Sequence, residues 1–214
     1  MTGMEWLGRY IDAARAAGST WLWSTGMTDW GRDPEMWPHL LALIPADAHV
    51  WCAGIATGEE PLVLAARTPD SVRITATDVR DDALAAARAG RYPRGMVDGA
   101  LDLGGITLDD VHRMFPDYDS PSDWLLASET LRSRIAWSRL DLTVDPYPRA
   151  DVVLCRNVLH MIAPPERADV VDRLAATGTP IVVGKSDLLH MAAYWRERFD
   201  EMPSQPFTLG ARTR

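Results

Sequence analysis

Apolar and polar positions along the chain predict strands and helices in turn. Short apolar runs, typical of strands buried in a parallel sheet, are followed by longer segments with apolar residues at helical spacing. The predicted strands are a run that opens at Val50 and the stretches 72–77, 135–140, 151–155 and 179–183. The predicted helices lie at 4–17, 34–44, 62–66, 81–89, 107–115 and 164–176. This alternation predicts an α/β fold with an open, mostly parallel sheet and helices on both faces.

The connection after the first strand carries the clearest chemical signal. It contains Gly54 and Gly58 and then becomes acidic at Glu59 and Glu60. Glycine has no Cβ, so the backbone of such a turn can approach a ligand closely. Asp78 ends the second strand, about 20 residues further on, which is the spacing of an acidic residue that binds ribose hydroxyls. The pattern predicts an adenosine-containing cofactor, although Asp78 could instead cap the next helix.

The same turn favours one cofactor over another. It lacks the G-x-G-x-x-G pattern of dinucleotide-binding proteins. Glu59 and Glu60 at a helix N-terminus are unfavourable for a pyrophosphate, which binds there through the positive end of the helix dipole. S-adenosylmethionine has no phosphate and carries a sulfonium cation, so the sequence favours it over NAD. Alternatively, both glutamates only complement the helix dipole.

Other polar residues follow predicted strands, where ligands of open α/β sheets bind. Asp141 could accept a hydrogen bond from an adenine amine, and His160 could act as a general base or be a structural histidine. Cys52 and Cys155 are expected to be reduced and buried near each other, because they end strands that should be neighbours.

Composition excludes several classes of protein. With 214 residues, the chain has room for one domain of ordinary size. A net charge of −8 argues against a nucleic-acid partner. We expect no metal site, no membrane partner and a cytoplasmic location, because no signal peptide or apolar run of about 18 residues is visible and two cysteines suit a reducing compartment.

Six blocks, taken in order, resemble the CheR-type chemotaxis receptor methyltransferases, a family of S-adenosylmethionine enzymes. These blocks are residues 28–34, 50–61, 76–78 with 87–92, 131–142, 155–159 and 184–187. The resemblance implies a class I methyltransferase fold, Rossmann-like, with a small inserted subdomain. It also implies cofactor contacts, to which the glycine turn adds Gly54. The implied contacts are Thr28, Arg32, Glu60, Asp78, Asp141, Leu142, Arg156 and Asn157.

The chain departs from the family pattern on the acceptor side. An asparagine before the threonine motif is Gly26, the second aromatic before Arg32 is Gly31, and the active-site tyrosine is Met161. Asp141 stands where the family has asparagine. An ionised aspartate can accept hydrogen bonds as asparagine does, but cannot donate them. The helical N-terminal receptor-binding domain is expected to be missing.

These features together predict an S-adenosylmethionine-dependent methyltransferase that acts on a small-molecule or peptide carboxylate or hydroxyl, rather than on chemotaxis receptors. Arg32 is the candidate that orients the acceptor, and His160 is the candidate base. Trp21, Trp23 and Trp30 either line an apolar acceptor pocket or cover the core. The alternative is a non-catalytic protein that binds the cofactor as a sensor or partner.

The expected organisation has two parts. Residues 1–45 would form N-terminal helices and a Trp-rich segment over the cofactor. Residues 46–214 would form the methyltransferase domain, with a small insertion at about 95–135.

Overall fold

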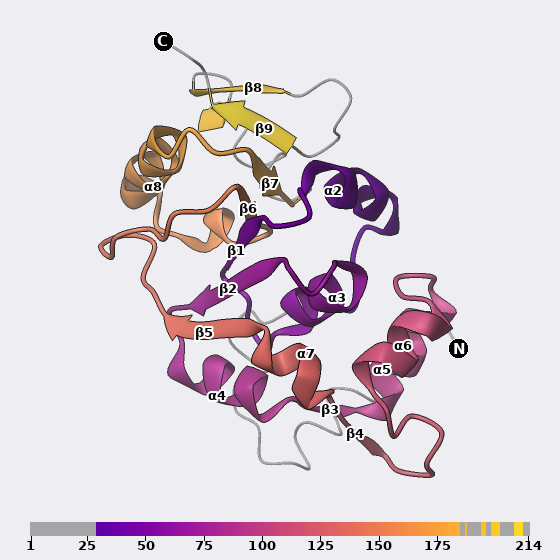
Figure 1. The fold of residues 1–214 in the computed structure, drawn as a ribbon. Coiled ribbons are helices and arrows are strands. Elements are labelled where there is room, and N and C mark those ends of the chain that lie inside the picture. Colours follow the sequence, from indigo (N-terminus) through magenta and orange to yellow (C-terminus); the bar gives the residue numbers. More distant parts are fainter. Residues whose placement is uncertain (1–28, 185–186, 188–193, 196–197, 202–207, 212–214) are drawn as a thin grey trace.

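A seven-stranded sheet forms the centre of the molecule (Figure 1). The structure is a computed structural model that describes residues 29–184, 187, 194–195, 198–201 and 208–211. The strand order is β5-β2-β1-β6-β7-β9-β8. The strands are β1 (His49–Ala53), β2 (Arg73–Asp78), β5 (Ile135–Arg139), β6 (Val152–Cys155), β7 (Ile181–Val183), β8 (Phe199–Glu201) and β9 (Thr208–Ala211). The first five of these run parallel, while β9 pairs antiparallel with both β7 and β8.

The chain builds the sheet outward in both directions from β1. It proceeds from β1 to β2 and β5 on one side, and then crosses to β6 and β7 on the other. The order therefore reverses between β1 and β6, and a crevice opens there beyond the carboxyl ends of the strands. The connecting helices are η2 (Pro34–Met36), α2 (Trp37–Leu43), α3 (Glu59–Arg67), α4 (Asp81–Ala89), η3 (Leu159–Met161) and α8 (Pro164–Ala176).

Helices cover both faces of the sheet, which explains why its strands are almost wholly apolar. In β1, Val50 and Cys52 belong to a core cluster on one face, with residues of α2, α3 and α4. Trp51 and Ala53 belong to a cluster on the other face, with residues of α8. The expected open, mostly parallel α/β sheet with helices on both faces is confirmed.

A small subdomain is inserted between α4 and β5. Its strands β3 (Arg91–Pro93) and β4 (Trp124–Leu126) pair antiparallel. Helices α5 (Arg94–Asp102) and α6 (Leu108–Met114) lie between these strands in the sequence. Helix α7 (Glu129–Ser133) leads from it to β5. The subdomain contributes to the same core cluster as β1, through Val97, Val111 and Phe115. Within the subdomain, β3 is followed directly by α5 without an intervening turn.

Several predictions concern the two ends of the chain. The helix at 4–17 lies outside the described residues, as do Trp21 and Trp23. The edge strands β8 and β9 were not predicted from the sequence. Trp30 and Leu40 pack in the same cluster as the sheet, and the proposed division at residue 45 stays a prediction. Within the described part of the chain, no helix combines the length and apolar character needed to cross a membrane.

Cys52 and Cys155 are both buried and free, so the predicted burial is confirmed. Their proximity is less than the sequence suggested. Cys52 pairs in register with Leu154, and Ala53 pairs with Cys155. Because successive side chains of a strand point to opposite faces, the two thiols lie on opposite sides of the sheet.

Candidate functional site

A cavity of about 310 Å³ opens at the carboxyl ends of the parallel strands. This volume lies in the range of small-molecule sites, about 300–1,000 Å³. Segments that follow β1, β2, β5 and β6 supply most of its wall, together with Glu60 of α3 and the segment before η2. The lining segments are 54–56, 78–80, 140–143 and 156–158. The cavity thus lies at the switch point of the sheet, where the topology predicts a ligand.

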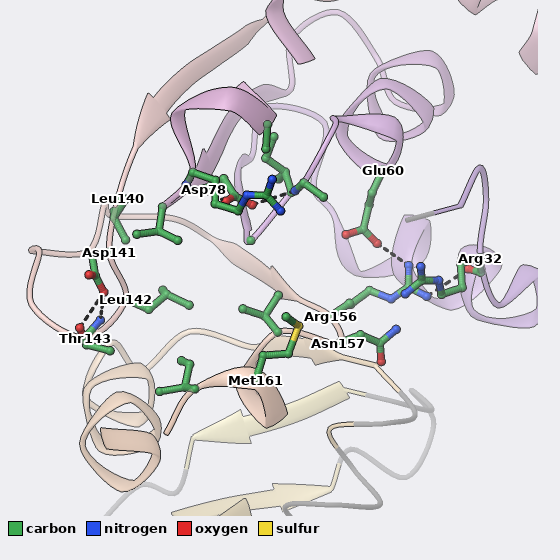
Figure 2. A pocket seen from close by; sticks show the side chains of 18 of the residues that line it. Arg32, Glu60, Asp78, Leu140, Asp141, Leu142, Thr143, Arg156, Asn157 and Met161 are labelled. Carbon is green, nitrogen blue, oxygen red and sulfur yellow. Dashed lines mark hydrogen bonds and ion pairs between the residues drawn. The ribbon is translucent and has the colours of Figure 1, made fainter. Parts of the chain in front are cut away.

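The two ends of the cavity differ chemically (Figure 2). Leu140 to Thr143 lie at one end of the view, and Glu60, Arg156 and Arg32 lie at the other. Asp78 and Met161 lie between them, on the upper and lower sides. An elongated ligand could therefore place an apolar ring at one end and a charged group at the other.

Asp78 shapes the turn after β1 and still faces the cavity. Its Oδ2 accepts a hydrogen bond from the backbone N–H of Ala56 at 2.8 Å, and its Oδ1 accepts one from that of Arg80 at 3.0 Å. The N-cap of α4 is Arg80 and has no side-chain cap, so the alternative that Asp78 caps this helix is not observed. A carboxylate has about four acceptor positions, so Asp78 can also accept bonds from ligand hydroxyls.

Asp141 stands at the far end, in a loop fixed by hydrogen bonds. Its Oδ1 accepts from the Thr143 hydroxyl at 2.6 Å and from the Thr143 backbone N–H at 2.9 Å. These bonds hold the pKa of Asp141 below its usual value, chiefly through the hydroxyl. The carbonyl of Leu142 accepts from Tyr147 and Arg173, so the neighbouring backbone is also held in place.

Arg156 joins three parts of the cavity wall. Its Nη1 pairs with Oε1 of Glu60, and its Nη2 donates to Oδ2 of Asp33 at 2.7 Å and to the carbonyl of Arg32 at 3.1 Å. Burial alone would lower the pKa of Arg156, but the carboxylates of Glu60 and Asp33 raise it. Asp33 occupies the N-cap position of η2, but its side chain makes no cap bond and pairs with Arg156 instead.

Unusual backbone conformations concentrate around the cavity. The non-glycine residues with positive φ in the described part are Asp33 at 55°, Ala56 at 47° and Asn157 at 56°. Ala56 and Asn157 line the cavity, and Asp33 binds Arg156. Such conformations cost about 1–3 kcal/mol each and persist where the surroundings enforce them, often at functional sites.

Gly54 is required for packing as well as for its conformation. Its φ is 70°, and a Cβ there would lie 2.3 Å from Cγ2 of Val158. Any side chain at position 54 would therefore displace the segment after β6. The sequence predicted a close approach of a ligand to this backbone, and here the side chain of Val158 makes that close approach.

The structure brings most of the sequence-predicted site residues to this one cavity. Those that line it are Arg32, Gly54, Glu60, Asp78, Asp141, Leu142, Arg156 and Asn157. Thr28 lies outside the described residues. Trp30 is in the core, edge-on to Tyr92 and Phe115, rather than in the cavity wall.

His160 is placed differently from the prediction. It is not among the residues that line the cavity. Its Nδ1 lies 2.8 Å from Oδ1 of Asp187, a carboxylate with no exposed surface, which also accepts the backbone N–H groups of Val158 and His160. The arrangement fixes the segment after β6 and does not place the imidazole as a base in the cavity.

Sequence analysis missed two acidic residues of the site. Asp29 lines the cavity, and burial raises its pKa despite the nearby charge of Arg32 and a hydrogen bond from the backbone of Trp30. Asp187 supports the wall through the contacts above. Both residues fall within blocks of the family resemblance, 28–34 and 184–187, but those blocks assigned neither a role. No group of three or more His, Cys, Asp or Glu among the described residues is placed to hold a metal ion.

The fold and the cavity together define a Rossmann-like domain of the class I methyltransferase type. The family model described as "CheR methyltransferase, SAM binding domain" matches residues 36–205, and the chain belongs to this family. The cofactor of this family of methyltransferase domains is S-adenosylmethionine. The donor set fits it: Asp78 can accept from ribose hydroxyls, and Leu140 and Leu142 offer an apolar wall to adenine.

Several curated relatives are named as chemotaxis methyltransferases. The chain is 29% identical over 159 residues to "Chemotaxis protein methyltransferase 1" of Pseudomonas aeruginosa, covering 66% of this chain and 55% of that one. It is 28% identical to "Chemotaxis protein methyltransferase" of Vibrio parahaemolyticus, covering 65% of this chain and 54% of that one. The chain thus spans about half the length of these relatives.

Solved structures are more distant. The N-terminal domain of EvdMO1 with SAH bound has a TM-score of 0.44 at 16% identity, covering 71% of this chain and 49% of that one. A likeness of this size supports no argument about function.

Proposed function

We propose that this domain binds S-adenosylmethionine in the cavity and transfers its methyl group to an oxygen acceptor, with a carboxylate of a small molecule or peptide as the favoured class. The observation that carries the proposal is one cavity with Asp78 beside the turn after β1 and Arg32 at the opposite end from Asp141. Asp78 suits a ribose, and Arg32 suits an anionic group.

Each end of the cavity has a role in this proposal. Asp141 would accept a hydrogen bond from the adenine amine, and Leu142 would pack on the ring. Asp78 would bind the ribose hydroxyls. Glu60, Arg156 and Asn157 would surround the amino-acid part of the cofactor, and Arg32 would face its methyl end and the acceptor.

The described cavity wall suits an acceptor that needs no base. When bound, S-adenosylmethionine supplies a methyl group on a sulfonium sulfur, which an acceptor oxygen displaces to leave S-adenosylhomocysteine. A carboxylate, with a reference pKa of about 4, is already ionised at neutral pH. No histidine or lysine is found among the described lining residues. The guanidinium of Arg32 could orient such an acceptor through two parallel hydrogen bonds.

A hydroxyl acceptor is the second candidate, and Asp29 favours it. This carboxyl lines the cavity, and its burial raises its pKa, which makes it a better proton acceptor than an ordinary aspartate. It would take the proton that the hydroxyl loses as the methyl group is transferred, and release it to solvent afterwards.

The proposal departs from the receptor substrates that the family resemblance implies. Met161 lines the cavity where the resemblance places a tyrosine, and 46% of it is exposed. A thioether cannot donate the hydrogen bond of a phenol. We therefore propose a different acceptor from that of the chemotaxis enzymes.

Calorimetry with S-adenosylhomocysteine tests the cofactor part. Asp78→Ala should weaken binding about 10- to 100-fold through lost hydrogen bonds to a charged group, and NAD should not bind. The exposed Asp123→Ala is the control and should bind like the wild type. Unchanged affinity in Asp78→Ala, or tight NAD binding, would contradict the assignment.

Transfer of a labelled methyl group tests the acceptor part. We expect transfer to carboxylate- or hydroxyl-containing compounds and none to receptor-containing membranes. Tight cofactor binding without transfer to any acceptor would favour the non-catalytic sensor instead.

A further inference from the structure

The guanidinium of Arg156 is committed to protein partners. Both hydrogens of Nη2 are used, on Asp33 and on the carbonyl of Arg32, and Nη1 binds Glu60. Only 4% of the side chain is exposed, although the cavity beside it is open. Nε has no accessible surface and no hydrogen-bond partner among the described residues, so it does not face the cavity. Three of the five N–H hydrogens of the guanidinium are therefore bonded to the protein.

The segment before η2 is held from two sides. On one side, Trp30 is buried against Tyr92 and Phe115, and Gly31, at φ 64°, abuts Gly105 so closely that a Cβ would lie 1.8 Å from its carbonyl oxygen. On the other side, Asp33 is fixed by Arg156. Between these anchors stands Arg32, whose side chain lines the cavity.

We propose that Asp33 and Arg156 form a clamp that sets the position of Arg32 in the cavity, so that this ion pair acts on the bound cofactor through Arg32. The clamp consists of the 2.7 Å ion pair to Asp33 and the 3.1 Å bond to the Arg32 carbonyl. The inference rests on the proposed function in one respect, because it requires Arg32 to contact bound S-adenosylmethionine or its product.

The strained backbone of Asp33 supports this role. A non-glycine residue such as Asp33 keeps a φ of 55° only where its surroundings enforce that conformation. A buried ion pair also adds little net stability compared with apolar packing, whereas loss of one partner is costly. An ion pair that fixes a strained residue next to a cavity-lining arginine is better explained by the placement of that arginine.

A double-mutant cycle with the full chain tests the clamp, with S-adenosylhomocysteine affinity as the readout. Asp33→Asn and Arg32→Gln should each weaken binding about 10-fold, the lower range for a charged hydrogen bond. If Asp33 acts through Arg32, the double variant should lose no more than about 3-fold beyond Arg32→Gln alone.

Two further variants separate the clamp from general folding. Asp33→Gly accepts the left-handed backbone without strain but removes the carboxylate, and should lose affinity like Asp33→Asn. Asp98→Asn is the control, because Asp98 accepts a hydrogen bond from the Tyr118 hydroxyl at 2.8 Å and neither residue lines the cavity. It should lower the melting temperature and leave the affinity unchanged.

Three results would overturn the clamp. Full addition of the two losses in the double variant would mean that Asp33 and Arg156 act independently of Arg32. Wild-type affinity in Asp33→Gly would show that only the backbone conformation matters. Wild-type affinity in Arg32→Gln would remove the contact on which the clamp acts. By contrast, failure of the wild type to bind S-adenosylhomocysteine would contradict the proposed function itself.

Discussion

At the scale of single residues, the carboxylates around the cavity have different surroundings and so different properties. Glu60 is paired with Arg156, Asp78 accepts two backbone N–H groups, and Thr143 holds the pKa of Asp141 low. The pKa of Asp29 is raised, because burial outweighs the charge of Arg32. The same carboxyl that could accept a proton is therefore also a source of instability when ionised.

We expect Asp29→Asn to raise the melting temperature at neutral pH, because asparagine avoids burial of a charge. A raised pKa in the folded state gives a favourable contribution below the unfolded pKa, about 3.9, which is lost as the pH rises through the folded pKa. The gain from the substitution should therefore shrink near pH 4. Thermal unfolding at both pH values measures it, with the exposed Asp123→Asn as control. A gain that does not change with pH would contradict the assigned burial of charge.

Among the predicted site residues that line the cavity, some depend only on the end of a strand. Asp78 ends β2 and Asn157 follows β6, so the alternation of strands and helices was enough to place them at this edge of the sheet. The clamp could not be predicted, because Asp33 and Arg156 are 123 positions apart. The pairing of His160 with Asp187 was missed for the same reason, since it joins the ends of two strands.

At the scale of elements, helix α6 is stabilised by a capping box that the sequence indicates. The Thr107 hydroxyl accepts from the backbone N–H of Asp110 at 3.1 Å, and Asp110 accepts from that of Thr107 at 2.9 Å. Arg67 of α3 binds the same carboxylate at 2.7 Å, so the cap also joins the subdomain to the sheet domain.

We expect Thr107→Ala to destabilise the protein by about 1 kcal/mol, the usual cost of losing an N-cap. For a chain of this size, that is a fall in melting temperature of about 2–4 °C. Thr107→Ser keeps the hydroxyl and should remain near the wild type. Equal melting temperatures for the alanine and serine variants would show that the cap contributes nothing.

Length separates many of the strands that sequence analysis found from those that it missed, although the three-residue β7 was found and the four-residue β9 was missed. Strands β1, β2, β5 and β6 have four to six residues and a strong apolar or alternating pattern. Strands β3 and β8 have only three residues each, too few for a period of two to be visible. Their formation depends on a partner strand distant in sequence, as in the pairing of Tyr92 with Leu125.

At the scale of the whole molecule, the two cysteines report on the opening of the central sheet. Both have no exposed surface, and they lie on opposite faces, under different helices. Burial raises the pKa of each thiol well above its usual value, so neither reacts readily while the sheet is intact.

We expect a thiol-specific reagent to label Cys52 and Cys155 at the same slow rate in the native protein, because both become accessible only when the sheet opens as a unit. The cavity is built from the ends of these same strands, so a ligand bound there should stabilise the sheet. S-adenosylhomocysteine at about 100 times its dissociation constant adds about 2.7 kcal/mol and should slow both reactions about 100-fold where opening is a rapid equilibrium. Mass spectrometry of the labelled peptides follows each thiol separately, and Asp78→Ala should show less protection at the same ligand concentration. Rapid labelling of one thiol without the other, or protection of only one by the ligand, would show that the two halves of the sheet open independently.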